Sequence, residues 1–282
     1  MLNLMRIEFL KMQGLGNDFV VFDAPTVDGD HDIDADTLRA LANRRTGIGC
    51  DQALMLEPPR DPHHRAFYRV FNADGNEVEQ CGNGARCVAA LMFSRQPELG
   101  RELTLESAAG AVRARVLGDG LVSVDMGIPN FEPRALPMDA AAEMPSYSLQ
   151  IGGTDLEFGA VSMGNPHVVL RVPDVATAPV ERIGPAIESH PRFAKRTNVG
   201  FMQIVDRSQI RLRVYERGAG ETLACGTGAC AAVAIGVARG LLDSEVRVDL
   251  PGGRAIVAWK GIGQPMWLTG PATTVFTGSI DI

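Results

Sequence analysis

A short glycine-rich motif occurs twice in the chain. Residues 81–87 read CGNGARC and residues 225–230 read CGTGAC. Each motif runs into an apolar, alanine-rich stretch, 88–93 in the first case and 231–238 in the second, that predicts a helix. Because both cysteines stand at a glycine-rich turn into a helix, we expect the chain to build the same structural unit twice.

Other segments repeat in the same order along the two halves. One of these matches aligns Gln52 with Gln203. Matches that keep their order over half the chain indicate an internal duplication. The matched pairs are GNDFVVFD (16–23) with GNPHVVLRV (164–172), RRTGIGCDQ (44–52) with KRTNVGFMQ (195–203), and LTLESAAG (103–110) with VRVDLPGG (246–253).

Each half combines extended apolar stretches, one helix after the cysteine motif, and alternating strands with glycine turns. Alanine-rich helices with little polar surface are buried ones, so each helix should be wrapped by its own curved, mostly antiparallel sheet. The expected fold is α+β, with two pseudo-symmetric domains and an active site in the cleft between them. The expected domains are 1–127 and 128–270, with proline-rich 127–137 as linker and the tail 271–282 as a candidate to pack back on the first domain.

Composition narrows the class of ligand. The 282 residues carry a formal charge of −7, which argues against a general attraction to nucleic acid or to an anionic membrane and favours a small molecule. No apolar run approaches the ~20 residues of a membrane span, and the start of the chain lacks the features of a cleaved signal peptide. We therefore expect a cytoplasmic protein.

The five cysteines are too few, and odd in number, for a disulfide scaffold. A zinc site made of Cys81, Cys87, Cys225 and Cys230 would need closer ligand spacing than these motifs have, so no metal is expected. Single cysteines are usually small buried hydrophobic residues, and this interpretation suits Cys50, Cys87 and Cys230. The duplication sets Cys81 and Cys225 apart.

A cysteine at a helix start lies in a field that favours the thiolate, but the helix dipole contributes only about 0.3–1 kcal/mol, against about 1.4 kcal/mol per pKa unit. A second proton-handling group beside each sulfur is therefore expected, and Glu216 and His167 are the candidates.

Inverting a stereocentre next to a carboxylate needs one group to remove the α-proton and another to return a proton on the opposite face. Two cysteines from pseudo-symmetric domains could supply both groups, while backbone amides at the helix starts hold the carboxylate. Those amides belong to Gly82, Asn83, Gly226 and Thr227.

The sequence resembles the diaminopimelate epimerase family along essentially its whole length. The resemblance rests on GLGNDFVV, TGIGCDQ, FNADG, CGNGARC, GNPH, RTNV and YERGAGETLACGTGAC. It implies a cofactor-independent amino-acid epimerase of lysine and peptidoglycan precursor synthesis, with no pyridoxal phosphate, that is often a homodimer. Cys81 and Cys225 would be the acid and base, His167 and Glu216 would adjust the two sulfurs, and the four helix-start residues would cradle the reacting carboxylate. The side chains implied around the rest of the substrate are Asn17, Gln52, Asn72, Asn165, Asn198, Glu216 and Arg217.

Two alternatives remain open from the sequence. The chain could be another member of the same superfamily, such as a proline or hydroxyproline racemase or a phenazine-pathway isomerase. Both kinds of relative fit the sequence less well. Arg217 suits a second substrate carboxylate, which proline lacks, and the phenazine-type relatives lack the cysteine pair. The chain could also be a redox-switched binding module whose two reactive thiols sense oxidants. Exchange of the substrate α-proton would distinguish an epimerase from such a module.

Overall fold

The computed structural model describes residues 6–24, 33–78 and 81–281. The first residues of the chain, considered above for a signal peptide, lie partly outside this range. The chain divides into two compact units: one ends at Val124 and resumes at Gly270, and the other is Asp125–Thr269. In the described part of the chain, no helix combines the length and the apolar character needed to cross a lipid bilayer.

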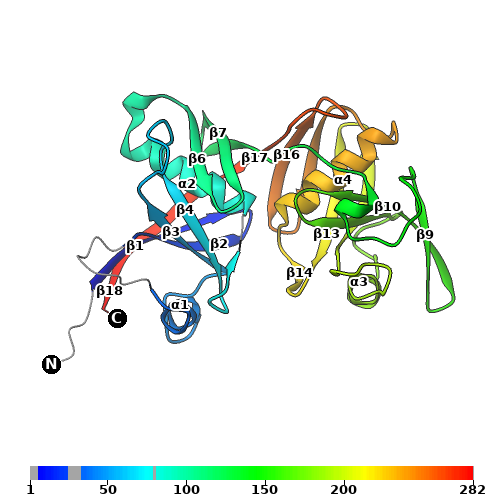
Figure 1. Cartoon of the computed structure of the whole chain (residues 1–282), viewed down its shortest axis with the longest axis horizontal. Helices are drawn as coiled ribbons and strands as arrows, with labels where there is room; N and C mark the ends of the chain where they lie inside the picture. Colours follow the sequence, from blue (N-terminus) through cyan, green and yellow to red (C-terminus); the bar gives the residue numbers. More distant parts are fainter. Residues whose placement is uncertain (1–5, 25–32, 79–80, 282) are drawn as a thin grey trace. The chain divides into compact units, whose positions relative to one another are not determined.

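In its described residues the first unit is a mixed sheet with two α-helices and one short 3-10 helix (Figure 1). Its strands lie in the order β18, β1, β2, β3, β4, β6, β7, β8, with the short β5 paired to β4. The parallel pairs β2–β3 and β4–β6 need crossover connections, and these contain α1 and α2. The elements are β1 (Arg6–Gly14), β2 (Asn17–Asp23), α1 (Ala35–Ala42), β3 (Gln52–Glu57), β4 (Phe67–Asn72), β5 (Glu77–Val78), α2 (Gly82–Arg95), η1 (Pro97–Leu99), β6 (Glu102–Ser107), β7 (Gly110–Gly118), β8 (Leu121–Asp125) and β18 (Thr273–Asp281).

The second unit repeats this plan. Its strands lie in the order β9, β10, β11, β12, β13, β15, β16, β17, with β14 paired to β13. The parallel pairs are again the third and the fifth in this order, β11–β12 and β13–β15, and their connections contain α3 and α4. The elements are η2 (Pro133–Ala135), β9 (Tyr147–Ile151), β10 (Thr154–Ser162), β11 (Pro166–Arg171), α3 (Val180–Glu188), β12 (Asn198–Asp206), β13 (Gln209–Glu216), β14 (Gly220–Thr222), α4 (Gly226–Ala238), β15 (Glu245–Leu250), β16 (Gly253–Trp259) and β17 (Met266–Pro271).

The α+β class predicted from the sequence is confirmed by these elements. Each cysteine motif begins the helix that the sequence predicted after it, and each helix packs against the strands of its own unit. In α4 every residue from Gly228 to Gly236 is buried, which explains why the helix is apolar on all sides.

Strand register confirms the duplication and corrects one of the sequence matches. In the first unit Phe19 lies opposite Gln52, and in the second His167 lies opposite Asn198, both in parallel pairs that follow the matched GN dipeptides. Gln52 therefore corresponds to Asn198. The predicted equivalence of Gln52 and Gln203 was wrong because the Arg-Thr dipeptides of the two loops are not at corresponding positions. Gln203 lies further along β12, where its Oε1 atom accepts a hydrogen bond from the Val175 amide at 3.2 Å.

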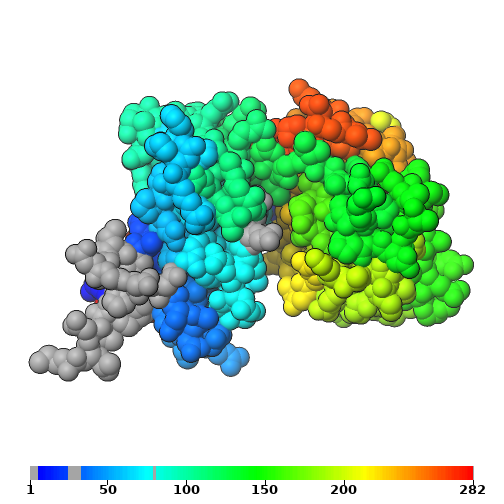
Figure 2. All heavy atoms as spheres, in the orientation of Figure 1, coloured from blue at the N-terminus to red at the C-terminus, as the bar shows by residue number. Residues whose placement is uncertain are grey.

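The segment 127–137, expected as the linker between the domains, belongs to the second unit and makes contacts within it. Asn130 forms an antiparallel bridge with Ser162, with N–H···O distances of 3.0 and 2.8 Å. Leu136 is fully buried and joins the core of the second unit. Figure 2 colours this part of the chain green, as it does the residues that follow it in the second unit. The segment is therefore a connection that pairs and packs with the second unit at Asn130 and Leu136.

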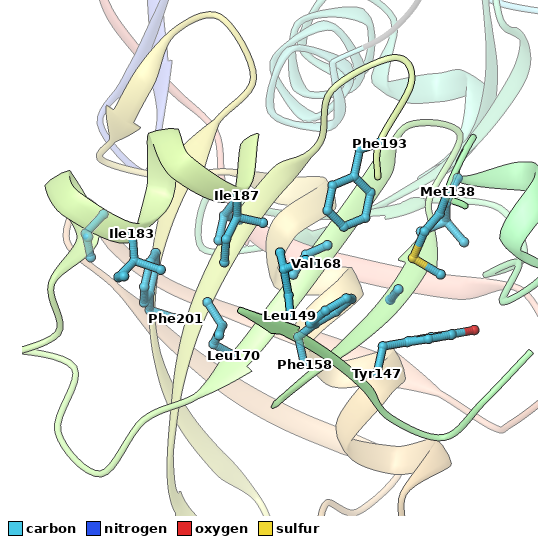
Figure 3. Close-up of a cluster of buried hydrophobic side chains, with 14 residues drawn as sticks. Met138, Tyr147, Leu149, Phe158, Val168, Leu170, Ile183, Ile187, Phe193 and Phe201 are labelled. Carbon is cyan, nitrogen blue, oxygen red and sulfur yellow. The ribbon is translucent and has the colours of Figure 1, made fainter. Parts of the chain in front are cut away.

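An aromatic and aliphatic cluster forms one side of the second unit (Figure 3). Tyr147 and Phe158 stack with ring centroids 5.6 Å apart, and Phe193 meets Phe158 edge-on at 6.1 Å. Ile183 and Ile187 of α3 cover the same cluster. This packing fixes the position of β11, the strand that carries His167.

A glycine in β10 allows α4 to approach the sheet. A Cβ atom added at Gly159 would lie 2.4 Å from Cγ2 of Ile235, well inside contact distance. We expect Gly159→Ala to lower the free energy of unfolding by roughly 1–3 kcal/mol through overpacking. Gly200→Ala is the matched control, because its added Cβ would meet its nearest neighbour, Val169, at an ordinary 3.4 Å. Urea unfolding should separate the two variants, and equal stabilities would contradict this packing.

Candidate functional site

Each motif cysteine is the residue immediately before its helix. Cys81 and Cys225 both have extended backbones, with φ/ψ of −138°/116° and −114°/109°. The first amides of a helix have no carbonyl partner within it, so they can bind an anion at its start. At these two helix starts the amides belong to Gly82 and Asn83 in α2 and to Gly226 and Thr227 in α4.

The sulfur of Cys225 is held by groups of its own motif. It accepts a hydrogen bond from the Gly228 amide at 3.3 Å and lies 3.5 Å from the Thr227 hydroxyl oxygen. The residue is 4% exposed. Burial, and next the negative charge of Glu216, raise the pKa of the Cys225 thiol well above its usual value, although the Thr227 and Gly228 hydrogen bonds oppose this. The sulfur therefore has a carboxylate beside it that can share its proton.

Replacing Glu216 tests that electrostatic coupling. We expect Glu216→Gln to lower the Cys225 thiol pKa, because the neutral amide no longer opposes the thiolate, while burial keeps the pKa above its ordinary value. At pH 7 the thiolate fraction should rise on the order of tenfold. Ultraviolet thiolate absorbance measured against pH, corrected with a Cys225→Ala variant, gives the value. Glu221→Gln removes a nearby carboxylate that pairs with Arg213 instead and should leave the pKa unchanged.

His167 lies next to this sulfur site through Asn165. Its Nε2 atom is 3.0 Å from Asn165 Oδ1, and Asn165 Nδ2 is 3.5 Å from the Thr227 hydroxyl. His167 is 1% exposed, and burial, followed by the charge of Arg217, lowers its pKa to about 3. The imidazole is therefore neutral at physiological pH, and it can accept or donate a hydrogen bond without carrying charge.

Asn198 links β11 to the loop that carries Arg217. Its amide nitrogen donates to the Pro166 carbonyl at 2.9 Å, and its oxygen accepts from the Arg217 backbone amide at 2.9 Å. The Arg217 side chain is exposed and donates to the Lys195 carbonyl at 3.0 Å. Glu188 supports the same loop by accepting from the Gly218 amide at 2.8 Å.

In the first unit, the Cys81 sulfur lies beside the side-chain amides of Asn17 and Asn83. Its sulfur donates to Asn17 Oδ1 at 3.8 Å, and the same oxygen accepts from Asn83 Nδ2 at 3.1 Å. Cys81 is partly buried, and Asn83 is 3% exposed. Asn17 and Asn83 thus share the immediate environment of the first motif sulfur.

Gln52 and Asn72 form a cross-strand pair in this unit, with Gln52 Nε2 donating to Asn72 Oδ1 at 2.9 Å. The pairing of Ala53 with Phe71 matches that of Val199 with Tyr215, so Asn72 corresponds to Glu216. Each of these two residues lies nine positions before the motif cysteine of its own unit. Gln52 Oε1 is buried, and within the described residues it has no hydrogen-bond partner. That oxygen is available to accept from a bound ligand.

The remaining cysteines are packing residues, as the sequence predicted. Cys50, Cys87 and Cys230 are at most 2% exposed. Burial raises the pKa of Cys50 to about 11 and that of Cys87 to about 12, so both are thiols at neutral pH. Among the described residues there is no cluster of three or more His, Cys, Asp or Glu side chains suited to a metal ion.

The structure adds two charged residues that the sequence analysis missed. Asp51 accepts from Asn17 Nδ2 at 3.0 Å, and Arg86, fully buried, donates to Asn83 Oδ1 at 2.9 Å. Asp51 stands next to Gln52, and Arg86 is within the CGNGARC motif itself, so the motifs contained both. A charged residue in a helix that is otherwise buried was the signal for Arg86.

Solved structures share the fold of this chain. A hydroxyproline epimerase from Agrobacterium vitis superposes with a TM-score of 0.70 over 98% of this chain and 93% of its own, at 18% identity. A phenazine biosynthesis protein from Bacillus anthracis gives a TM-score of 0.69 over 99% of this chain and 100% of its own, at 17% identity. At such identities the likeness defines the fold alone.

Sequence comparison is more specific. The profile of the diaminopimelate epimerase family matches residues 9–132 and 159–275. A diaminopimelate epimerase from Thioalkalivibrio sulfidiphilus is 58% identical over 99% of this chain and 100% of its own length, and one from Chromobacterium violaceum is 53% identical with the same coverage. The chain belongs to the diaminopimelate epimerase family. It is an isomerase of the epimerase class.

Proposed function

We propose that the protein interconverts LL- and meso-diaminopimelate, without pyridoxal phosphate, in the synthesis of lysine and peptidoglycan precursors. The full-length similarity to enzymes named diaminopimelate epimerase, up to 58% identity, supports this substrate. The superfamily alternative is less well supported, since the chain's similarity to the hydroxyproline and phenazine proteins is at the level of fold.

The reaction proceeds by proton transfer at the α-carbon between Cys81 and Cys225. The observation that carries this proposal is the equivalence of the two sulfurs, each preceding the buried helix of one repeated unit. One sulfur, as thiolate, removes the α-proton, and the other, as thiol, donates a proton to the opposite face. In the reverse reaction the roles exchange. The mechanism requires that both sulfurs reach one substrate carbon during turnover.

The carbanionic intermediate carries negative charge on the substrate's α-carboxylate. Backbone amides at the two helix starts can donate hydrogen bonds to that group and stabilise it more strongly as charge develops. In α4 the third amide, that of Gly228, already contacts the Cys225 sulfur, so the first two remain for the carboxylate. The amides assigned to this cradle are those of Gly82, Asn83, Gly226 and Thr227.

Proton affinity at Cys225 is adjusted by Glu216, which is also suited to the substrate's α-ammonium group. His167 acts as a neutral group that holds Asn165 beside Thr227. The exposed guanidinium of Arg217 suits the distal carboxylate, to which a planar fork can bind in bidentate fashion. Gln52 Oε1 offers an acceptor for an ammonium group. The remaining side chains assigned to the substrate are Asn17, Asn72 and Asn198.

Incubation with LL-diaminopimelate, in buffer free of pyridoxal phosphate, tests the assignment. Chiral chromatography should show the meso isomer appearing and the mixture approaching one equilibrium from either side. L-proline, trans-4-hydroxy-L-proline and L-lysine form the comparison panel, and lysine isolates the contribution of the second carboxylate. Turnover of proline in preference to diaminopimelate would replace this function with the superfamily alternative, and no α-proton exchange with any amino acid would favour the redox-switched module.

A further inference from the structure

The orientation of the Asn17 side-chain amide is fixed by chemistry. Asp51 Oδ2 lies 3.0 Å from Asn17 Nδ2, and Asp51 Oδ1 accepts from Arg44 Nη2 at 2.7 Å. A carboxylate paired with a guanidinium can only accept hydrogen bonds, so the NH₂ end of Asn17 must face it. The carbonyl oxygen of Asn17 is therefore the end directed at Cys81 and Asn83.

The orientation of the Asn83 side-chain amide is fixed by its hydrogen bond with Arg86. Arg86 Nη2 lies 2.9 Å from Asn83 Oδ1, and a guanidinium can only donate, so the NH₂ end of Asn83 must face Asn17. Gly14 and Gly270 leave room for this guanidinium, because a Cβ atom added at either would lie within 3.3 Å of Arg86 atoms. The four side chains form one hydrogen-bonded series, Asp51–Asn17–Asn83–Arg86. Asp51 at one end can only accept and Arg86 at the other can only donate, so every hydrogen bond in the series has one possible direction.

We infer that Asp51 and Arg86 are positioning residues that lock the side-chain amides of Asn17 and Asn83, so that a carbonyl oxygen is held beside the Cys81 sulfur. This inference rests on the proposed function only in giving Cys81 a part in proton transfer. An acceptor beside the sulfur favours its protonated form and raises its proton affinity. Asn17 thereby acts on Cys81 as the Glu216 carboxylate acts on Cys225, and the two sulfurs are brought closer in basicity, as a reversible two-base reaction requires.

A second network holds Asp51 in place. Arg44 donates to both carboxylate oxygens of Asp18, at 2.9 and 2.6 Å, and Asp18 also pairs with the buried Lys11 at 2.6 Å. The Asp51 amide donates to Asp18 Oδ1 at 2.9 Å, and the Asp18 amide donates to Asp51 Oδ2 at 3.1 Å. Asp51 is therefore fixed from several directions before any ligand arrives.

The two units differ at this point. By register, Gln52 corresponds to Asn198, so Asp51 corresponds to Thr197, whose hydroxyl donates to the Asn198 carbonyl. Asn165, the counterpart of Asn17, instead contacts His167. The carboxylate that orients Asn17 is thus a feature of the Cys81 unit, and the test can address that sulfur separately.

The test is the pH dependence of Cys81 alkylation by iodoacetamide in Asp51→Ala, read from the modified peptide by mass spectrometry without any substrate. Loss of the carboxylate removes the acceptor of the Asn17 NH₂ group, so the amide can turn that group to the sulfur, giving up the hydrogen bond that its oxygen accepts from Asn83 Nδ2. The Cys81 thiol pKa should fall on the order of one unit, so alkylation at pH 7 should become about tenfold faster. Asp51→Asn retains an oxygen acceptor for Asn17 and should stay within about threefold of the wild-type rate.

Asp23→Ala is the matched control, because Asp23 ends the same strand as Asn17 and pairs with a guanidinium, that of Arg95, at 2.7 and 2.9 Å. It should leave Cys81 alkylation unchanged. Tyr68 and Cys87 also interact electrostatically with Cys81, but burial raises both of their pKa values, that of Cys87 to about 12, so neither titrates in the tested range.

An unchanged Cys81 pKa in Asp51→Ala, with a lowered free energy of unfolding, would overturn the inference and leave Asp51 a purely structural residue. Because the alkylation measurement involves no turnover, it stands apart from the proposed function. That function fails if the wild-type protein does not interconvert the diaminopimelate isomers. The positioning role fails only if the pKa of the Cys81 thiol is the same in Asp51→Ala as in the wild type.

Discussion

Replacing Cys81 or Cys225 with alanine should lower the rate of epimerisation by at least about 10³-fold, because each sulfur supplies one of two proton transfers and water replaces it poorly. The loss should appear in kcat, with KM changed little, since neither sulfur is assigned to substrate binding. Isomer interconversion followed by chiral chromatography gives both constants.

Cys50→Ala and Cys230→Ala serve as controls for these variants. Both residues are buried, and both should lose stability without losing turnover per folded molecule. Activity in Cys225→Ala comparable with that of either control would contradict the two-base reaction. Complete loss of activity in the controls would show that the assay reports unfolding of the protein. Unfolding curves measured in parallel identify that case.

Stability should fall steeply with pH below neutrality because of His167. Its folded pKa is about 3, from burial first and the charge of Arg217 second, against about 6.5 in the unfolded chain. Between these values the unfolded state binds a proton that the folded state does not, so the free energy of unfolding rises with pH across that window and is flat above it. Going from pH 6.5 to pH 5 should remove roughly 2 kcal/mol, at about 1.4 kcal/mol per unit.

Urea unfolding at several pH values, in the wild type and in His167→Gln, isolates this effect. The variant should be less stable at pH 7 but should lack the histidine's share of the slope between pH 5 and pH 6.5. Few carboxyl groups titrate in that range, so the difference between the two slopes belongs to His167. Parallel slopes in the two proteins would mean that the buried imidazole accepts a proton in the folded state.

The duplicated motif was enough to predict the fold class and the pair of candidate sulfurs. A cysteine followed by Gly-x-Gly and a buried helix has a local signature, and its repetition implied the repeated unit around it. Alignment of the loops was less secure. The Arg-Thr dipeptides drew Gln52 onto Gln203, and hydrogen-bonded strand register was needed to pair Gln52 with Asn198.

Contacts between segments that are distant in the sequence could not be predicted from it. Asn17 begins β2 and Asp51 directly precedes the neighbouring strand β3, and nothing local to either residue says which end of the amide the carboxylate meets. The connection at 127–137 is similar, because its prolines indicate a break in regular structure, whereas the burial of Leu136 depends on the core that it joins. In both cases the deciding interaction is tertiary.

The most direct test of the two-cysteine reaction is the early phase of turnover of LL-diaminopimelate in deuterated water. A thiol exchanges its proton with solvent, so the product should receive deuterium from one sulfur while the other sulfur carries away the substrate proton. We predict that the first meso-diaminopimelate formed carries one deuterium at the inverted carbon and that the remaining LL-substrate stays unlabelled. Product that retains the substrate's own proton would show a single base serving both faces and would contradict the account.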